Sequence, residues 1–195
     1  IHWSLRTVPI STSGTQYPIQ CVNYANGLYF ADGQSLLAVS TDTIHWIART
    51  TSNSFTSVTG TGTGNTSIVY GYSGTEEAHV YCWSSYAGMT TSTDTIHWTR
   101  RTKPYATSGT YYNKDSLYND GYFLTVGGDS TNYMIIASTD AIVWQFRTFG
   151  ATPVSGGLYY IQYLDEISKY CAIGYNHYGL STDAIHWDPY DSLSG

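Results

Sequence analysis

The sequence predicts an all-β fold built from repeated four-stranded units, and three observations support this prediction. Strand-like runs alternate with turn dipeptides along the chain. No segment keeps the 3.6-residue apolar period of a helix. A heptapeptide ending in tryptophan recurs every 43 to 52 residues, giving Trp3, Trp46, Trp98, Trp144 and Trp187. Four short strands in units of about 40 to 50 residues are typical of β-propeller blades. We therefore expect a β-propeller of four-stranded antiparallel blades, with four blades visible, either as a four-bladed ring or as part of a larger ring.

The first repeat shows the expected order of strands and turns. Its strands are predicted at residues 17–25, 28–31, 36–39 and 44–50. The Asn-Gly and Asp-Gly dipeptides at 26–27 and 32–33 favour tight turns between them. In the fourth strand, Ile44 and Trp46 are expected on one face and His45 on the other. The third repeat copies this order at 116–118, 122–126 and 133–137, with turns at 120–121 and 127–128. Residues 50–67 are rich in Gly, Ser and Thr and are predicted to form a long loop.

We expect residues 1–195 to form a single β-propeller domain. The repeats are placed approximately at residues 4–46, 47–98, 99–144 and 145–187, with a tail at 188–195. Arg-Thr begins three residues after each of the first four tryptophans, so four of the five arginines belong to the repeat. Asp188-Pro189-Tyr190 breaks this rule after Trp187. The break predicts that the C-terminal end is a true end and that any missing residues precede Ile1.

Composition and charge exclude several classes of function. The net charge is -6, the pI is near 5.3 and only three lysines are present. We therefore expect neither a nucleic-acid partner nor a cationic anchor to lipid. The longest apolar runs, such as residues 134–137, are far shorter than the roughly 20 residues of a membrane span, so no membrane insertion is expected. Cys21, Cys82 and Cys171 are odd in number and lie in apolar runs, which favours buried free thiols over a disulfide framework.

Each full heptapeptide has the form Ser-Thr-Asp-x-Ile-His-Trp, except that Val143 replaces histidine in the third copy. An aspartate at this position accepts backbone N–H bonds in a tight turn, and the serine caps that turn. The tryptophan buries a large area between sheets. The expected structural residues are Ser40, Asp42, Trp46, Ser92, Asp94, Trp98, Ser138, Asp140, Trp144, Ser181, Asp183 and Trp187.

This heptapeptide resembles the Asp-box, Ser-x-Asp-x-Gly-x-x-Trp, of sialidase-type (BNR) propellers. It is closest to the Ser-Thr-Asp-Gly-x-x-Trp repeats of bacterial and bacteriophage propellers, and the resemblance covers nearly the whole chain. The resemblance implies a β-propeller in which the motif is a structural hairpin at the blade edge, away from the usual binding face. The family's glycine is replaced here by Thr43, Thr95, Ala141 and Ala184. Because threonine and alanine disfavour a left-handed conformation, we expect a turn that differs from the standard Asp-box.

The sequence gives little support for a catalytic or metal-binding site. The repeat histidines are His2, His45, His97 and His186. They would be spread around the ring, so we expect partly packed strand histidines, no metal and no cofactor. The repeated arginines are expected to bond backbone carbonyls or a neighbouring aspartate, because a sialidase needs nonequivalent arginines. The acidic pairs at 76–77 and 165–166 fall at turns between the first and second strands, where solvated carboxylates are expected. We therefore expect no enzymatic activity.

Aromatic and amide-bearing segments outside the heptapeptide supply the candidate binding residues. Such side chains stack on sugar rings and bond their hydroxyls, and Tyr-, Ser- and Gly-rich loops form adaptable protein-binding surfaces. The alternative is that they only fill space between blades. Trp83 is included because it is the one tryptophan outside the repeat. The candidates are Trp83, Tyr86, Tyr111, Tyr112, Asn113, Tyr159, Tyr175, Asn176 and Tyr178, with Tyr160 beside Tyr159.

Together these observations predict a non-enzymatic recognition or adhesion propeller that binds glycans or a surface protein. We expect it at an extracellular or virion surface, as a receptor-binding component of a phage or similar particle, and as an oligomer or part of a larger assembly. Two alternatives stay open. The first is a structural virion or appendage decoration protein with no ligand. The second is a sialidase-like glycoside hydrolase, since fold alone does not confer or exclude activity.

Overall fold

The computed structural model describes residues 19–33, 37–49, 67–85, 88–104, 112–129, 132–147, 156–175 and 177–191. These residues form four antiparallel four-stranded sheets, which we call blades 1 to 4 in chain order. Within the same ranges, the one helical element is the three-residue 3-10 turn η1 (Asp165–Ile167). The predicted all-β class with four-stranded antiparallel blades is confirmed. No helix in the described residues is long and apolar enough to cross a membrane.

In every blade the strands pair in chain order, each with the next. Blade 1 contains β1 (Ile19–Ala25), β2 (Leu28–Gly33), β3 (Leu37–Ser40) and β4 (Ile47–Arg49). Blade 2 contains β5 (Ser67–Ser73), β6 (Ala78–Ser85), β7 (Gly88–Ser92) and β8 (Thr99–Arg101). Blade 3 contains β9 (Tyr112–Asn119), β10 (Tyr122–Gly128), β11 (Tyr133–Ser138) and β12 (Gln145–Arg147). Blade 4 contains β13 (Leu158–Leu164), β14 (Lys169–Gly174), β15 (His177–Ser181) and β16 (Asp188–Asp191).

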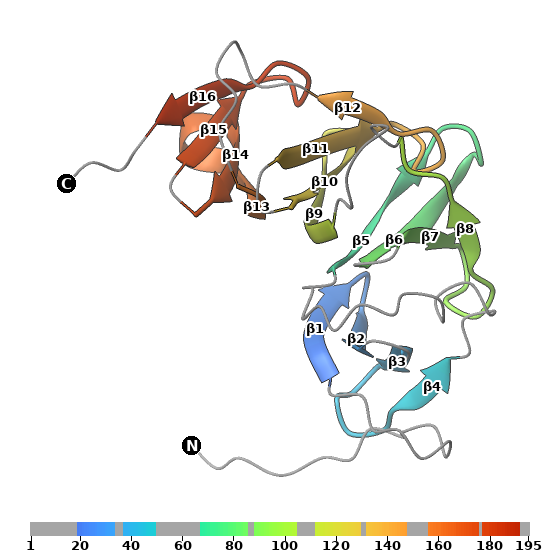
Figure 1. The fold of residues 1–195 in the computed structure, drawn as a ribbon. Helices are drawn as coiled ribbons and strands as arrows, with labels where there is room; N and C mark the ends of the chain where they lie inside the picture. Colours follow the sequence, from blue (N-terminus) through green and yellow to red (C-terminus); the bar gives the residue numbers. More distant parts are fainter. Residues whose placement is uncertain are drawn as a thin grey trace.

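The blades are arranged around a common axis as an open arc (Figure 1). The first strand of each blade lies on the concave side, where β1 contacts β5, β5 contacts β9, and β9 contacts β13. The fourth strands, β4, β8, β12 and β16, lie on the convex side (Figure 1). Blades 1 and 4 are the two ends of the arc. The four blades are therefore not closed on themselves as a four-bladed ring.

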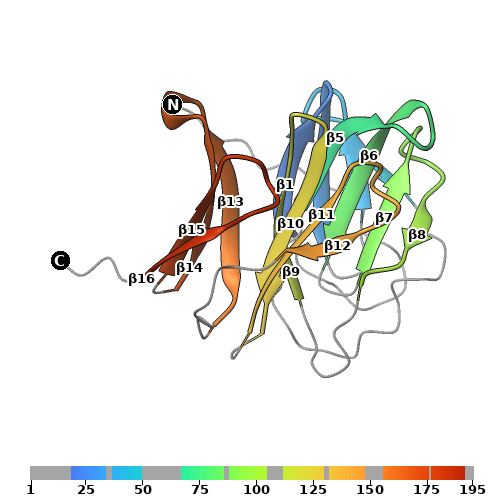
Figure 2. The same ribbon diagram turned by 90° about the horizontal axis from the view of Figure 1, so that it is seen from above.

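Antiparallel pairing gives each blade two distinct ends. The hairpins that follow the first strands point to one end, as Figure 2 shows. The heptapeptide turns that follow the third strands lie at this same end, because strands one and three run in the same direction. Thr75 Oγ1 in the first hairpin of blade 2 donates to Asp140 Oδ2 in the heptapeptide turn of blade 3 at 2.8 Å. We call this the hairpin end, and the opposite end, where second strands connect to third strands, the loop end.

Three apolar clusters lie between the blades. We call the sheet face toward the next blade the forward face, and the face toward the preceding blade the rear face. The blade 1–2 cluster includes Phe30, Leu37, Val39, Ile68, Tyr81, Trp83 and Trp98. The blade 2–3 cluster includes Val80, Cys82, Met89, Phe123, Met134, Ile136, Ala141 and Trp144. The blade 3–4 cluster includes Leu124, Val126, Ile135, Ala137, Leu158, Ile161, Tyr170, Ala172, Ala184 and Trp187. The fold thus buries its core between adjacent sheets, as a propeller does.

Several predicted boundaries were wrong. The fourth strand of blade 1 begins at Ile47, so the Ile-His-Trp segment of the heptapeptide belongs to the turn rather than to the strand. Each sheet therefore extends past the predicted repeat boundary, which was placed at the tryptophan. The predicted tail contains β16, which pairs with β15 and completes blade 4. Asp32 and Gly127 were predicted in turns but lie in β2 and β10, where they pair with neighbouring strands. Of the predicted loop at 50–67, residues 50–66 lie outside the described residues, and Ser67 begins β5.

Candidate functional site

The heptapeptide forms a closed turn held by its own side chains. In blade 1, Asp42 Oδ1 accepts the backbone N–H groups of Ile44 at 2.8 Å and His45 at 2.7 Å. Ser40 Oγ accepts the backbone N–H of Thr43 at 2.9 Å. Trp46 Nε1 donates to the Thr43 carbonyl at 3.1 Å, and the equivalent bonds in the other blades measure 3.1 to 3.3 Å. The aspartate and serine act as predicted, and the motif is a structural turn on the hairpin end.

The expectation that this turn avoids a left-handed residue was wrong. Thr43, Thr95, Ala141 and Ala184 have φ angles of 64°, 63°, 58° and 62°. The last three have buried side chains, and Ala141 and Ala184 belong to the clusters shared with the preceding blade. A glycine there would relieve the backbone strain but would lose this contact. Packing between blades therefore accounts for the side chains of Ala141 and Ala184 at a position where the Asp-box motif has glycine.

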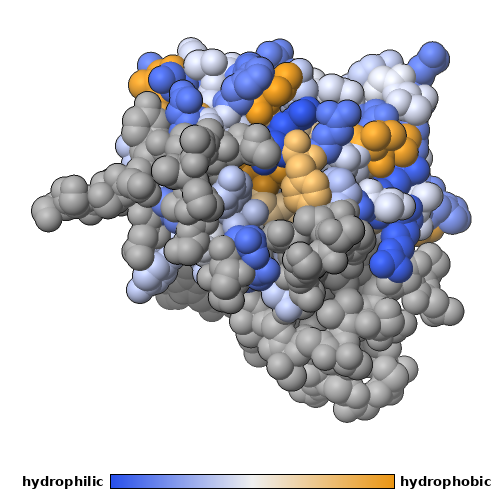
Figure 3. Space-filling view, turned by 45° about the horizontal axis from the view of Figure 1, so that its top comes forward, coloured by the Kyte–Doolittle hydropathy of each residue, from blue (hydrophilic) through white to orange (hydrophobic). Residues whose placement is uncertain are grey.

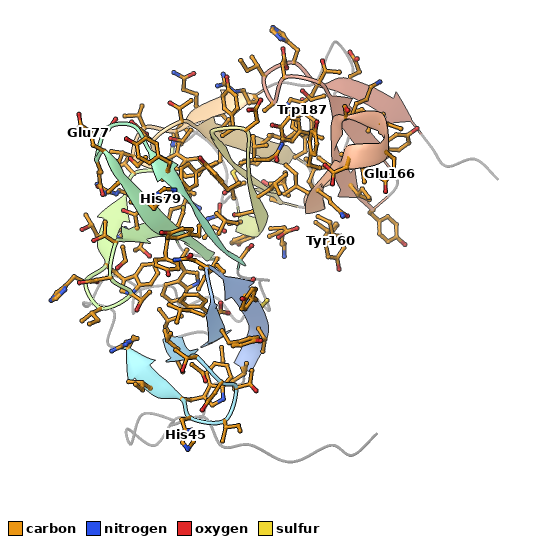
Figure 4. The ribbon with its side chains drawn as sticks, turned by 180° about the vertical axis from the view of Figure 1, so that it is seen from behind. His45, Glu77, His79, Tyr160, Glu166 and Trp187 are labelled. Atoms are coloured by element: carbon orange, nitrogen blue, oxygen red, sulfur yellow. The ribbon has the colours of Figure 1, made fainter. Side chains whose placement is uncertain are left out.

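Three repeat histidines, His45, His97 and His186, are not packed strand residues, which corrects that prediction, and His2 lies outside the described residues. His45, His97 and His186 lie in the turns with 84 to 86% of each side chain exposed, and each Nδ1 is 2.7 Å from its turn aspartate. Figure 4 shows His45 at the tip of blade 1. The histidine contact, followed by the backbone N–H bonds, lowers the pKa of Asp42, Asp94 and Asp183. Among the described residues, no three His, Cys, Asp or Glu side chains are grouped as metal ligands.

Two of the repeat arginines, Arg101 and Arg147, bond side chains rather than the predicted carbonyls or aspartates, and Arg6 lies outside the described residues. Arg101 Nε donates to Thr91 Oγ1 at 2.7 Å, and its guanidinium forms an ion pair with Glu76. Arg147 donates to Gln145 Oε1 at 3.2 Å. Glu76 therefore belongs to a contact inside blade 2. The acidic pairs lie at the turns between the first and second strands, as predicted.

A second aromatic element of the repeat was missed in the sequence. Each blade has a cross-strand pair of aromatic rings between its first and second strands, with centroids 4.6 to 4.9 Å apart. The pairs are Tyr24–Tyr29, Tyr70–Tyr81, Tyr118–Phe123 and Tyr163–Tyr170. In blades 2, 3 and 4 they pack into the clusters shared with the preceding blade. In the sequence, these pairs are indicated by an aromatic residue on either side of every first hairpin. Seven tyrosines are thereby explained as repeat residues.

Two predicted ligand residues are buried, which corrects their assignment. Trp83 is 2% exposed and packs edge-on against Trp98, with ring centroids 5.9 Å apart. Asn113 is fully buried, donates to the Gly88 carbonyl at 3.1 Å and accepts from Lys103 Nζ at 3.4 Å. Both side chains position strands and cannot reach a ligand. The predicted residues Tyr86, Tyr111 and Asn176 lie outside the described residues.

The remaining predicted tyrosines do not share one surface. Tyr112 is half-buried at the start of β9, where it pairs with Gly128. Tyr178 is half-buried and pairs with Ile173 on the forward face of blade 4. Tyr159 and Tyr175 lie close to the loop end of blade 4, since Tyr175 follows Gly174, the strand partner of Leu158. Of the predicted binding residues, the structure therefore brings together only Tyr159 and Tyr175 of blade 4 among those described.

A β-bulge at the start of β13 creates the most exposed aromatic surface of this blade. Leu158 pairs with Gly174 and Tyr160 with Ile173, so Tyr159 is the extra residue. The bulge leaves Tyr159 38% exposed and Tyr160 59% exposed, and Tyr175 is 82% exposed. Tyr160 projects into the open concave side of the arc in Figure 4. We call Lys114, Tyr159, Tyr160 and Tyr175 the inner tyrosine rim.

Blade 3 contributes a cation to this rim through an equivalent bulge. Asp115 pairs with Val126 and Asn113 with Gly127, which makes Lys114 the extra residue. Lys114 Nζ lies 5.7 Å from the centroid of the Tyr159 ring, within cation–π range. The neighbouring Asp115 carboxylate accepts the Ile161 backbone N–H at 3.1 Å and ties β9 to β13. Burial raises the pKa of Asp115. The rim thus combines three exposed phenol rings and one cation, with Tyr159, Tyr160 and Lys114 on strands and Tyr175 directly after β14.

Comparisons with known proteins support the fold. No family model matches the chain, and no curated protein matches it. Among solved structures, it is similar to YCF48 bound to D1 peptide, with a TM-score of 0.51 and 12% identity over 95% of this chain. The fold is that of a β-propeller. The match covers 61% of the YCF48 chain, so this chain spans less than two thirds of that propeller.

Proposed function

We propose that this β-propeller is a non-enzymatic recognition module that binds a protein segment on the inner tyrosine rim. The observation that carries the proposal is the β13 bulge, which exposes Tyr159 and Tyr160 together. Tyrosine supplies a large contact area and a hydroxyl at a small cost in conformational entropy. Strand-borne side chains are already ordered before binding, which lowers the cost of association.

The composition of the rim indicates what the segment contains. The phenol rings favour apolar or aromatic side chains, whereas Lys114 favours a carboxylate. An acidic segment with apolar side chains therefore fits the rim best. The similar propeller YCF48 has been solved bound to a peptide, which supports a peptide as the ligand class here.

A glycan is the second candidate ligand, because exposed tyrosines also stack on sugar rings. The resemblance of the heptapeptide to bacteriophage propeller repeats favours a virion or other extracellular surface as the location. With either ligand, we assign no catalytic role to the acidic turns. Glu76 is held by Arg101 in blade 2, and Glu166 lies at the hairpin of blade 4, away from the Arg101 contact (Figure 4).

Parallel selection against peptides and glycans tests the proposal. A phage-displayed peptide library and a glycan array are screened with the labelled chain, and the dissociation constant of the best ligand is measured by calorimetry. We expect acidic peptides with aromatic or aliphatic anchors. The double variant Tyr159→Ala/Tyr160→Ala should weaken binding about 30-fold or more, as loss of a central aromatic anchor does. Tyr72→Ala is the matched control, because Tyr72 is 44% exposed on blade 2.

The outcomes separate the hypotheses. Equal loss of binding in the Tyr72→Ala control would place the ligand elsewhere and contradict the rim. Selection of glycans alone, lost in the double variant, would replace the peptide by a sugar at the same site. Failure of both screens would favour the structural decoration protein, and turnover of a fluorogenic glycoside would revive the hydrolase.

A further inference from the structure

The first hairpin of blade 2 is longer than the first hairpins of the other blades. From the cross-strand aromatic pair towards the turn, blades 1, 3 and 4 each have one further pair of residues, namely Ala25–Leu28, Asn119–Tyr122 and Leu164–Lys169. Blade 2 has three, namely Gly71–Val80, Tyr72–His79 and Ser73–Ala78. We call residues 72–79 the hairpin extension. The other three blades form without such an extension, so the blade architecture does not require it.

The hairpin extension is fixed by bonds to blade 3 and to its own blade. Ser73 Oγ donates to the Asp140 carbonyl at 2.8 Å, and Thr75 Oγ1 donates to the Asp140 carboxylate. Glu76 in the turn forms an ion pair with Arg101 of β8. These contacts order the extension before any ligand binds, which lowers the cost of association.

The rear face of the extension, towards blade 1, is open to solvent. Tyr72 and His79 follow Tyr70 and Tyr81 at two-residue spacing, so they point to the face that packs on blade 1. Tyr72 is 44% exposed and His79 is also exposed, whereas Tyr81 is buried. The shorter hairpin of blade 1 reaches Tyr81, whose hydroxyl accepts from Asn26 Nδ2 at 3.0 Å. The two additional aromatic residues therefore lie beyond the contact between blades 1 and 2.

The imidazole of His79 is held between two tyrosine rings. It stacks on Tyr70 with centroids 5.2 Å apart and an interplanar angle of 15°. It meets the Tyr72 ring edge-on, at 5.4 Å and 69°. Figure 4 shows Glu77 at the tip of this hairpin and His79 nearer the body of the blade. We call Tyr70, Tyr72 and His79 the aromatic wall.

Isolated exposed residues do not by themselves indicate a ligand. On the face drawn in Figure 3, apolar residues are separate spots in a hydrophilic surface. Such scattered residues are normal on soluble proteins. The aromatic wall differs, because its three rings contact one another and two of them are exposed.

We propose that the aromatic wall and Asn26 bind a neutral sugar ring of a glycan. A sugar ring has C–H groups on its faces and hydroxyls around its edge, so it binds where aromatic surface and polar groups occur together. The rings of Tyr72 and His79 supply the surface. The Asn26 amide is exposed at the foot of the wall, beside Tyr81. Its bond to Tyr81 uses one Nδ2 hydrogen, which leaves the second hydrogen and Oδ1 for sugar hydroxyls.

The charge of the extension favours a neutral sugar over a charged ligand. Residues 71–80 contain Glu76 and Glu77 and neither lysine nor arginine, so the carboxylate of an acidic sugar would be repelled. A basic peptide is the alternative, because a cation also stacks on a tyrosine ring. A cation has only hydrogen-bond donors, however, and Asn26 Nδ2 is itself a donor. Glu76 is already engaged by Arg101. These contacts favour the sugar.

A glycan array probed with the labelled 195-residue chain tests the proposal. The array carries neutral glycans ending in glucose, galactose, mannose or N-acetylglucosamine, with sialylated glycans as the anionic comparison. We expect binding to at least one neutral glycan. NMR titration of the chain with that glycan, followed on isotope-labelled aromatic rings, should shift the signals of Tyr72 and His79 and leave those of Tyr24 unchanged.

Three variants separate the ring surface from the amide. Tyr72→Ala should weaken glycan binding about tenfold, as loss of an aromatic contact does. Tyr72→Phe keeps the ring and should retain most of the affinity. Asn26→Gly tolerates the left-handed turn, where Asn26 has a φ of 48°, and removes the amide, so it should weaken binding about threefold to tenfold.

Tyr24→Ala is the matched control. Tyr24 is 64% exposed and pairs with Tyr29, with ring centroids 4.9 Å apart, on the rear face of blade 1 and away from blade 2. Its truncation should leave glycan binding unchanged. Circular dichroism confirms that each variant is folded.

Four results would overturn the proposal. No binding to any neutral glycan on the array, or stronger binding to sialylated ones, would contradict a neutral sugar as the ligand. Equal weakening in Tyr24→Ala would show that the wall is not the site. Glycan binding that is lost in Tyr159→Ala/Tyr160→Ala and kept in Tyr72→Ala would place the sugar at the inner tyrosine rim. Basic peptides that bind the chain and are lost in Tyr72→Ala would assign the wall to a cation.

The proposal does not depend on peptide recognition, since the aromatic wall and the inner tyrosine rim share no residue. A peptide bound at the rim should keep its affinity in Tyr72→Ala. A glycan bound at the wall should keep its affinity in Tyr159→Ala/Tyr160→Ala. Failure of either site therefore leaves the test of the other unchanged.

Discussion

Truncating two tryptophans of the same motif separates their local role from their role between blades. Trp98 and Trp46 make the same turn bond, each from Nε1 to a carbonyl at 3.1 Å. Trp98 is 8% exposed and packs against Trp83, whereas Trp46 is half-buried. Truncation of a buried tryptophan costs about 3–5 kcal/mol, and a half-buried one about half as much. Trp98→Ala should therefore lower the free energy of unfolding by about 2 kcal/mol more than Trp46→Ala.

Urea denaturation followed by far-UV circular dichroism measures this difference. With roughly 2–4 °C per kcal/mol for a domain of this size, Trp98→Ala should also lower the melting temperature by about 10 °C. Equal losses for the two variants would contradict this expectation, because they would assign the whole effect to the turn and none to inter-blade burial.

Four further substitutions test the heptapeptide turn and one buried charge. Thr43→Gly should stabilise the chain by up to about 1 kcal/mol, because it relieves the backbone strain of an exposed left-handed residue. Ala184→Gly should stabilise the chain less, or destabilise it, because it also loses a buried contact. Thermal melts compare the two variants. Because the pKa of Asp94 is lowered in the folded chain, its carboxylate stabilises the fold fully at pH values above its unfolded pKa of 3.8, and this stabilisation is lost as the pH falls below 3.8. Asp94→Asn should therefore reduce the fall in melting temperature at acidic pH. Burial, with Arg100 nearby, lowers the pKa of Lys103 from 10.5 to about 8, so its charge disfavours folding at neutral pH. Lys103→Met should be more stable than the wild type at pH 7, and the gap should narrow as the pH rises from about 8 to 10.5.

Local features of this fold could be predicted from the sequence. The heptapeptide turn depends on contacts within seven residues, so its serine, aspartate and tryptophan could be assigned roles directly. The left-handed Ala141 and Ala184 could not be foreseen, because a contact with the preceding blade compensates the backbone strain. His45 was wrongly placed on a strand, because an alternating apolar pattern does not show where a turn ends and a strand begins.

The candidate site was predicted less well because exposure depends on register. Trp83 was assigned to a ligand since it lies outside the heptapeptide, yet it fills the contact with blade 1. The aromatic pairs become visible only when both strands of the first hairpin are aligned. Tyr159 and Tyr160 are exposed together because of a one-residue bulge, and no residue pattern in the sequence marks that position. Tyrosine enrichment therefore indicated both core and surface residues without distinguishing them.

Hydrogen–deuterium exchange of the chain with and without its selected peptide tests recognition at the inner tyrosine rim most directly. We expect slower exchange in residues 112–118 and 158–164, the first strands of blades 3 and 4, with little change in the heptapeptide turns at the hairpin end. Protection confined to those turns, or to blade 2 alone, would contradict recognition at the rim.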